Sequence, residues 1–374
     1  MADEYTVRTR TSYIDNVTAA FLMALFGAFL FFASFFVLWI NEGRTNPATV
    51  ARMSIAISSA SVDASAEGKL VAATGTLAST EQLGDSSYVR PGNYLSLQRT
   101  VEMYAWSESR DTKTNTSVGG QKTSETTYRY EKKWTTSPPK SSSFEYSAGH
   151  ANPQMPIKGE TLTVRSASLG AYQVDPQALT LPEGQPLVLN VVSVQHDGTW
   201  RVSGEYLVNR ENAINQPQVG DLRISYTVVP NSLEVTLFGK ASGSQLVPFE
   251  AKGISLYRAF TENREQAIST LNGEYLLSLW LLRVGGFLMM WLGLFLGLGP
   301  ISTMLDILPF LGSASRFITG ASTFVVTLLL SLVTIIASII AHNIFLLIGL
   351  LVLIVVAIVL GGRIRRPAMS ATPV

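Results

Sequence analysis

One charged side chain, Arg283, interrupts the apolar run of residues 276–298. An arginine at the centre of a membrane helix costs about 2.5 to 3.5 kcal/mol, so its presence indicates a function. It lies seven residues, about 10 Å of helix, beyond Leu276. Arg283 is therefore either interfacial, with its long stem reaching the headgroups, or a buried cation paired with Ser331 or Glu274.

Other residue types that support catalysis or metal binding are few and scattered. Cysteine is absent, and the spacing of His150, His196 and His342 is not that of metal ligands. No serine lies in a G-x-S-x-G motif. Glu102 and Glu108 share one face of a predicted strand, where a solvated surface explains them most simply. We therefore expect no metal, no cofactor and no enzymatic activity.

Composition indicates a membrane protein. Of 374 residues, 47% are hydrophobic and only 15% are charged, against roughly 25% charged in soluble domains. The net charge of +1 gives no basic patch for nucleic acid, so we expect the lipid bilayer as a partner and no nucleic acid.

Four apolar runs predict transmembrane helices over residues 17–40, 276–298, 317–341 and 344–360. The first run has no charge for 24 residues, about 36 Å of helix, which exceeds a hydrocarbon core of about 30 Å. Only His342 and Asn343 separate the last two runs, which predicts a tight helical turn and a close-packed hairpin.

Arginines near the ends of these runs predict the orientation. Arg8 and Arg10 precede the first run, Arg316 precedes the third, and three arginines follow the fourth. Positive residues favour the cytoplasmic side, so we expect residues 1–16, 299–316 and 361–374 in the cytoplasm. Residues 299–316 have apolar residues at near-helical spacing and predict an amphipathic segment on the inner bilayer surface. Residues 41–275 then lie outside the cytoplasm.

Residues 41–275 read as a β-rich domain. Alternating patterns over 99–109 and 127–135, with Gly119 and Gly120 between them, predict a long hairpin with a solvated tip. Further strands are predicted over 69–77, 161–174, 187–195, 200–208, 221–229, 233–239 and 245–251. This number of short strands predicts a barrel or a sandwich, with an OB-like barrel as one possibility. Helices are predicted over 46–63, as an amphipathic helix, and over 260–275, continuing into the second run.

Small and hydroxylated residues recur every three or four positions in the third apolar run. They are Gly320, Thr323, Thr327, Ser331, Thr334 and Ser338. Such residues allow helices to approach closely within a membrane. The stripe either carries lateral association between chains or packs against the second and fourth helices of the same chain.

Six segments, taken together and in order, resemble the transmembrane protein 43 family, also called LUMA. They are "INEGR" (40–44), "RTVEMYAWSE" (99–108), "TYRYEKKW" (127–134), "GHANP" (149–153), "PQVGDLRISY" (217–226) and "GSQLVPF" (243–249). The motif positions are Asn41, Glu42, Gly43, Arg44, Glu102, Tyr104, Trp106, Gly149, His150, Asn152, Pro153, Gly220, Asp221, Arg223, Pro248 and Phe249. The run around Arg283 also resembles the second span of the family.

The resemblance implies a non-enzymatic, multi-pass membrane scaffold that self-associates and organises membrane protein complexes. In animal members it implies the endoplasmic reticulum and the inner nuclear membrane. The long polar N-terminus of those members is mostly missing here, so we expect a bacterial protein of the inner membrane with a periplasmic domain. The alternatives are a channel or transporter subunit and a membrane-anchored hydrolase.

Overall fold

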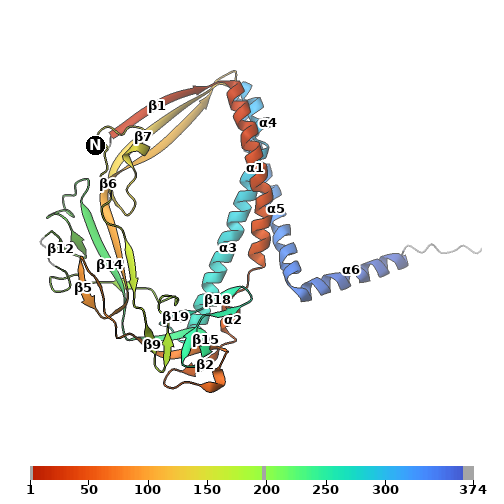
Figure 1. The fold of residues 1–374 in the computed structure, drawn as a ribbon. Helices are drawn as coiled ribbons and strands as arrows, with labels where there is room; N and C mark the ends of the chain where they lie inside the picture. Colours follow the sequence, from red (N-terminus) through yellow and green to blue (C-terminus); the bar gives the residue numbers. More distant parts are fainter. Residues whose placement is uncertain (1–2, 196–198, 365–374) are drawn as a thin grey trace, which may run out of the picture. The chain divides into compact units, whose positions relative to one another are not determined.

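The computed structural model describes residues 3–195 and 199–364, which form two compact units (Figure 1). The β unit contains the described residues of 1–8, 45–113 and 124–275. The helix unit contains those of 9–44, 114–123 and 276–374.

A closed five-stranded barrel is the first element of the β unit. Its strands pair in the order β15 (Leu233–Ser242), β16 (Gln245–Val247), β10 (Tyr172–Val174), β9 (Ala167–Leu169) and β3 (Leu70–Ala78), and β3 pairs with β15 to close the ring. β2 (Ile55–Ser58) and β19 (Arg258–Phe260) extend the sheet beside β3 and β15. Leu77, Leu169, Tyr172 and Leu237 are fully buried in the core. Of the two predicted architectures, the barrel is therefore confirmed.

A second sheet carries the predicted hairpin. Its order is β1 (Asp3–Thr11), β7 (Lys122–Thr135), β6 (Tyr94–Thr116), β14 (Leu222–Pro230), β13 (Tyr206–Val208) and β12 (Arg201–Ser203). β11 (Gln185–Pro186) pairs with β14, and β8 (Glu160–Thr163) pairs with β6. Leu95, Leu97, Val101, Met103 and Ala105 alternate along β6 and are buried. This period of two places one face of the strand in the core.

Two short hairpins and two 3-10 turns complete the β unit. The hairpins are β4 (Leu83–Asp85) with β5 (Val89–Gly92), and β17 (Phe249–Ala251) with β18 (Ile254–Leu256). The turns are η1 (Ala64–Ala66) and η2 (Ser141–Ser143).

Two predicted elements of the β unit are wrong. The amphipathic helix over 46–63 is only α2 (Pro47–Ala51), and the chain continues as β2 in parallel pairing with β3. The β-branched residues of β2 gain ladder hydrogen bonds there, which outweighs a helical spacing of apolar residues. The strand predicted over 187–195 is mostly turn, because Asn190 accepts hydrogen bonds from the backbone N–H groups of Val192 and Ser193.

The helix unit contains three helices that are long and apolar enough to cross a membrane, two short segments between them, and a final apolar helix. They are α1 (Tyr13–Glu42), α3 (Arg264–Gly297), α4 (Gly299–Met304), η3 (Leu305–Ile307), α5 (Pro309–His342) and α6 (Ile344–Ile364). A capping box between Ser12 and Asp15 begins α1. α3 begins in the β unit and is continuous, as predicted for residues 260–275 and 276–298.

The long helices bury polar side chains and expose apolar ones. Thr323, Thr327, Ser331, Thr334 and Ser338 are the buried residues of α5 beside Gly312. Val325, Leu329 and Val333 are 56%, 60% and 64% exposed. Apolar side chains on the outside of a helix bundle are typical of a lipid-facing surface.

The stripe of small residues therefore faces the helices of its own chain. α1 packs along α5, and Ser338 Oγ donates a hydrogen bond to the carbonyl of Trp39 at 2.9 Å. Trp291 Nε1 of α3 donates to the carbonyl of Gly320 at 3.1 Å. The covering helices are α1 and α3. The prediction was right for the second span, which is α3, and wrong for the fourth, whose place α1 takes. The predicted lateral association through this stripe is not supported, because its side chains are covered within one chain.

The tip of the β6–β7 hairpin contacts the helix unit and is only partly solvated, because Gly120 is buried while Ser117, Val118 and Gly119 are exposed. Gly119 N donates to the carbonyl of Ile307 at 2.9 Å, and Asn16 Nδ2 donates to that of Gly120 at 3.0 Å. Tyr13 Oη also bonds the carbonyl of Met304. The tip, the start of α1 and the 299–316 segment therefore share one end of the bundle, which conflicts with placing the tip and that segment on opposite sides of a bilayer.

The turn at Asn343 is as tight as predicted, but α6 does not pack closely on α5. Asn343 caps α6 by accepting hydrogen bonds from the N–H groups of Phe345 and Leu346. Of residues 344–357, only Leu347 is partly buried, and α6 leads away from α5 (Figure 1). The predicted close-packed hairpin is therefore wrong in this structure.

Candidate functional site

A buried ion pair joins the end of α1 to α3. Arg283 Nε donates to Glu42 Oε1 at 2.8 Å, and Arg283 Nη2 donates to Glu42 Oε2 at 2.7 Å. The side chain of Glu42 is 3% exposed and that of Arg283 is 17% exposed. The guanidinium also lies 4.8 Å from the ring centroid of Trp280. This bidentate geometry fixes both the distance and the orientation of the two helices.

The remaining residues of the "INEGR" motif extend this contact. Asn41 Nδ2 donates to the carbonyl of Leu279 at 3.0 Å, and Arg44 Nη2 donates to Ser278 Oγ at 2.6 Å. Each of these bonds runs from the end of α1 to α3. Asn41, Glu42 and Arg44 of the motif thus each make a polar contact with α3.

The motif glycine brings in the third helix. A Cβ on Gly43 would lie 2.6 Å from His342 Nε2 at the end of α5, so a larger residue would displace that histidine. His342 also packs its ring 5.4 Å from that of Trp39 and bonds Ser338 through Nδ1. We call Asn41, Glu42, Gly43, Arg44, Arg283 and His342 the helix clamp, because they join α1, α3 and α5 at one end.

Arg283 is paired, as one of the two sequence hypotheses held, but with Glu42 rather than with Ser331 or Glu274. Its depth in the bilayer stays a prediction. Ser331 Oγ donates to the carbonyl of Leu328, and Glu274 pairs with Arg258. Glu42 could have been found, because the ends of two successive antiparallel helices meet at one bilayer surface. The carboxylate that ends the first span and a guanidinium near the start of the second are natural partners.

A second charged cluster lies at the other end of the helix unit. The side chain of Asp306 is fully buried, and its Oδ1 accepts a hydrogen bond from Arg316 Nη1 at 2.6 Å. Lys122 Nζ of the hairpin tip lies 3.2 Å from Asp306 Oδ2. Gly312 leaves room for this carboxylate, since a Cβ there would overlap it. From the sequence, residues 299–316 were predicted only to form an amphipathic segment, and this cluster was not identified.

In the β unit, motif residues gather around His150, whose side chain is 1% exposed. Its ring stacks on Tyr130 at 3.9 Å between centroids and meets Trp106 edge-on at 4.7 Å. Nδ1 lies 2.8 Å from the carbonyl of Tyr146, and Nε2 lies 3.2 Å from Asp3 Oδ2. Both ring nitrogens thus lie within hydrogen-bond distance of an oxygen atom, which fixes the orientation of the ring.

Two further side chains fix this cluster. Asn152 Oδ1 accepts from the N–H of Trp106 at 2.7 Å, and its Nδ2 donates to the Trp106 carbonyl at 2.9 Å. Tyr130 Oη donates to Glu108 Oε2 at 2.5 Å. Burial and this bond to a carboxylate raise the pKa of Tyr130 to about 12. Glu108 thus accepts a structural hydrogen bond, whereas the sequence predicted a solvated residue.

The motif residues of β14 form ion pairs with neighbouring segments. Arg223 Nε donates to Glu102 Oε2 at 2.6 Å, and the guanidinium lies over the rings of Trp134 and Tyr206. Asp221 accepts from Arg210 at 2.9 and 2.6 Å. Burial acts to raise the pKa of Asp221, but these bonds and one from the N–H of Gln218 outweigh it and lower the pKa.

The remaining motif positions have structural roles or lie apart. Gly220 has φ +94°, and a Cβ there would lie 3.1 Å from Pro153. Gly149 also has a positive φ, +83°. Tyr104 lies 5.4 Å from Trp134, ring to ring. Phe249, after Pro248, begins β17 and packs on a core that contains α2 and the start of α3.

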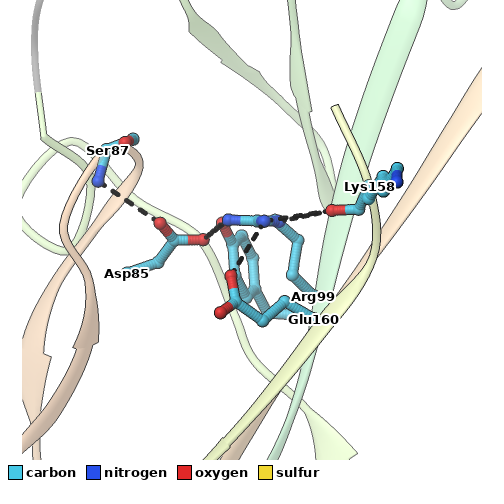
Figure 2. Close-up of polar contacts among 6 residues, drawn as sticks. Asp85, Ser87, Arg99, Lys158 and Glu160 are labelled. Atoms are coloured by element: carbon cyan, nitrogen blue, oxygen red, sulfur yellow. Dashed lines mark hydrogen bonds and ion pairs between the residues drawn. The ribbon is translucent and has the colours of Figure 1, made fainter. Parts of the chain in front are cut away.

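A buried network around Arg99 was not identified from sequence (Figure 2). Arg99 pairs with Asp85, donates to Glu160 Oε2 at 3.1 Å and donates to the carbonyl of Lys158. Tyr226 Oη donates to Asp85 Oδ2 at 2.8 Å. Burial and this bond raise the pKa of Tyr226. The network therefore links β4, β6, β8 and β14. Each of its side chains is already hydrogen-bonded to another, which indicates a structural role rather than a catalytic one.

Among the residues that the structure describes, no three His, Asp or Glu side chains gather as metal ligands. His150 is enclosed by aromatic rings, His342 belongs to the helix clamp, and His196 lies outside the described residues. The expected absence of a metal or cofactor stays a prediction.

The fold and the helix clamp define a class of membrane protein in which a β-rich insert containing a closed barrel follows the first of several apolar helices. The sequence model of the family described as "Transmembrane protein 43" matches residues 103–344. The chain therefore belongs to the transmembrane protein 43 family.

Several curated proteins are similar to this chain. Transmembrane protein 43 of Homo sapiens is 28% identical over 303 residues, covering 76% of this chain and 75% of the human protein. The Rattus norvegicus protein is 27% identical with the same coverage. The Drosophila melanogaster homolog is 26% identical over 248 residues, covering 64% of this chain and 65% of the fly protein. No solved structure matches the chain significantly.

Proposed function

We propose that this protein is a non-enzymatic membrane scaffold that self-associates and organises other membrane proteins through its β unit. The helix unit supports an anchoring role, because its apolar side chains face outward and its charges are paired inside. The charged and aromatic clusters of the β unit are likewise engaged with internal partners, which suits a structural role better than a catalytic one.

The observation that carries this proposal is an ordered apolar turn on the β unit. Val188, Val191 and Val192 are 79%, 66% and 75% exposed. Asn190 holds the turn, since its Oδ1 accepts two backbone hydrogen bonds and its N–H bonds Ser193 Oγ at 2.9 Å. A rigid turn that presents three valines loses little conformational entropy on binding. We propose a second copy of the chain as its partner, as the family resemblance implies.

The mass of the intact particle tests this proposal. Full-length protein in nanodiscs should have the mass of an oligomer, and Val191→Asp with Val192→Asp should lower it, because a charge in an apolar contact costs free energy of association. Val118→Asp is a matched control, since Val118 is 81% exposed on the hairpin tip. A monomeric wild-type particle, or equal masses for all three proteins, would contradict self-association through this turn.

The placement in a bacterial inner membrane, with a periplasmic β unit, is also proposed rather than established by the family. Because Gly119 bonds the carbonyl of Ile307, this placement requires the hairpin tip and the 299–316 segment to lie on the same side of the membrane. Single cysteines at Ser117 and Ser313, both exposed, should therefore react alike with a membrane-impermeant thiol reagent in intact cells. Opposite labelling would mean that the contact does not form in the membrane.

A further inference from the structure

Two adjoining recesses lie beside the start of α5, and one is polar while the other is apolar. The polar recess, of about 300 Å³, is lined by Thr114, Thr116, Lys122, Ser302 and Thr303. The apolar groove, of about 520 Å³, is lined by Trp291, Leu292, Phe317, Gly320, Ala321 and Phe324. Arg316 and Phe295 line both, so the two spaces adjoin at these residues. All of these residues belong to the helix unit.

The polar recess has an excess of positive charge. Lys122 and Arg316 share the single carboxylate of Asp306, which leaves one net positive charge. Arg316 uses Nη1 for this pair, and its side chain is 37% exposed. The other nitrogens of a guanidinium stay able to donate to a second acceptor, and arginine favours a phosphate for this purpose. The polar recess therefore suits an anion with several acceptor oxygens, such as a phosphate group.

The groove fits a hydrocarbon chain. Its one indole donor is engaged, because Trp291 Nε1 bonds the carbonyl of Gly320. Phe324 meets the ring of Trp291 edge-on at 5.6 Å, which forms an aromatic wall. Gly320 leaves the floor open, since the nearest atom to a Cβ there would be Phe295 Cε2 at 3.7 Å. No charged group other than Arg316 lines this space among the described residues.

We propose that the two recesses together bind one anionic phospholipid. The phosphate accepts hydrogen bonds from Arg316 and Lys122, and one acyl chain lies in the groove between α3 and α5. A free phosphate ion would occupy only the polar recess, whereas a neutral hydrocarbon would use only the groove. Because Arg316 and Phe295 line both recesses, a molecule with a phosphate next to an acyl chain can reach both at once. This inference requires the helix unit to lie in a membrane and does not depend on the scaffold function.

Native mass spectrometry of the full-length protein in mild detergent tests this site. Phosphatidylglycerol and phosphatidylcholine with identical acyl chains are added separately, and the bound lipids are counted. The wild-type protein should retain phosphatidylglycerol about tenfold more tightly, because both lipids present the same phosphate but the choline ammonium cancels its charge beside the net positive recess. Arg316→Gln should remove this preference, while Arg129→Gln, a change of equal charge on the exposed surface of the β unit, should retain it.

The groove is tested separately by Ala321→Phe, which fills it without touching Asp306. Binding of both lipids should then fall, while the thermal stability of the protein stays the same. Lys122→Gln provides a second test of the headgroup if Arg316→Gln fails to fold. Equal retention of the two lipids by the wild type, or unchanged retention in Lys122→Gln and Ala321→Phe, would overturn the proposal. Retention of inorganic phosphate without retention of either lipid would also overturn it, because it would show a plain phosphate site.

Discussion

Removing one partner of the Glu42–Arg283 pair should destabilise the helix unit strongly. Two unit charges about 4 Å apart attract by about 4 kcal/mol at an effective dielectric constant of about 20. The side chains are 3% and 17% exposed, so solvent screens this attraction little. Glu42→Gln leaves a buried guanidinium without its counterion, and such changes cost about 3 to 5 kcal/mol. We expect the same loss for Arg283→Gln.

The double variant separates the pair from its surroundings. Glu42→Gln combined with Arg283→Gln removes both charges, so its loss of unfolding free energy should be clearly smaller than the sum of the two single losses. The assay is unfolding of the purified protein in nanodiscs, followed by the fluorescence of its tryptophans. Arg8→Gln is the control, because its pair with Glu125 is exposed and should change stability by less than about 1 kcal/mol.

Two results would refute this reasoning. If the single losses add up in the double variant, then Glu42 and Arg283 do not interact in the membrane. If Arg283→Gln costs no more than Arg8→Gln, then Arg283 is interfacial and its charge is solvated. Retained stability in the double variant, with losses in both single variants, would show the coupling directly.

Three further predictions concern packing and pH. Gly293→Ala should destabilise by about 1 to 3 kcal/mol in the nanodisc assay, because its Cβ would lie 2.6 Å from a backbone nitrogen of α1, whereas Gly285→Ala has open space and should be neutral. Folding lowers the pKa of Asp221, so its carboxylate stabilises the folded state above the unfolded-state pKa of about 3.9. This stabilisation is lost as pH falls through the lower pKa of the folded state. Asp221→Asn should therefore make the melting temperature depend less on pH in the acid range. Folding raises the pKa of Tyr130 to about 12, so its protonated hydroxyl stabilises the folded state below about pH 10, the unfolded-state pKa. This stabilisation is lost as pH rises through about 12. Tyr130→Phe should therefore make the melting temperature depend less on pH in the alkaline range.

The helices were predictable because their signal is local. A run of 24 uncharged residues can be recognised without its neighbours, and α1 covers the predicted span 17–40. The hairpin of β6 and β7 was also predictable, because its alternation is long and its turn contains two glycines with positive φ. Membership of the family followed from six short motifs in a fixed order.

The predictions from sequence failed where contacts between segments distant in the chain determine the local structure. Residues 55–58 have helical spacing but become β2, because β3 offers a free edge for pairing. The partner of Arg283 lies 241 positions away in α1, so only the antiparallel arrangement of the first two helices, and no local pattern, could indicate it. The tip of the hairpin is polar and reads as solvated, yet it packs beside Ile307. Asp85 was missed because a lone aspartate in a short strand has no pattern of its own.

The most direct test of the account is an accessibility scan of α5 with nitroxide spin labels in a bilayer. Labels at Val325, Leu329 and Val333 should collide with oxygen and be shielded from a water-soluble nickel chelate, because these residues are exposed to lipid. Labels at Thr327 and Ser331 should be shielded from both, because α1 covers this face. Nickel accessibility at the first three positions, or the same oxygen accessibility at all five, would contradict a membrane anchor with its polar stripe inside.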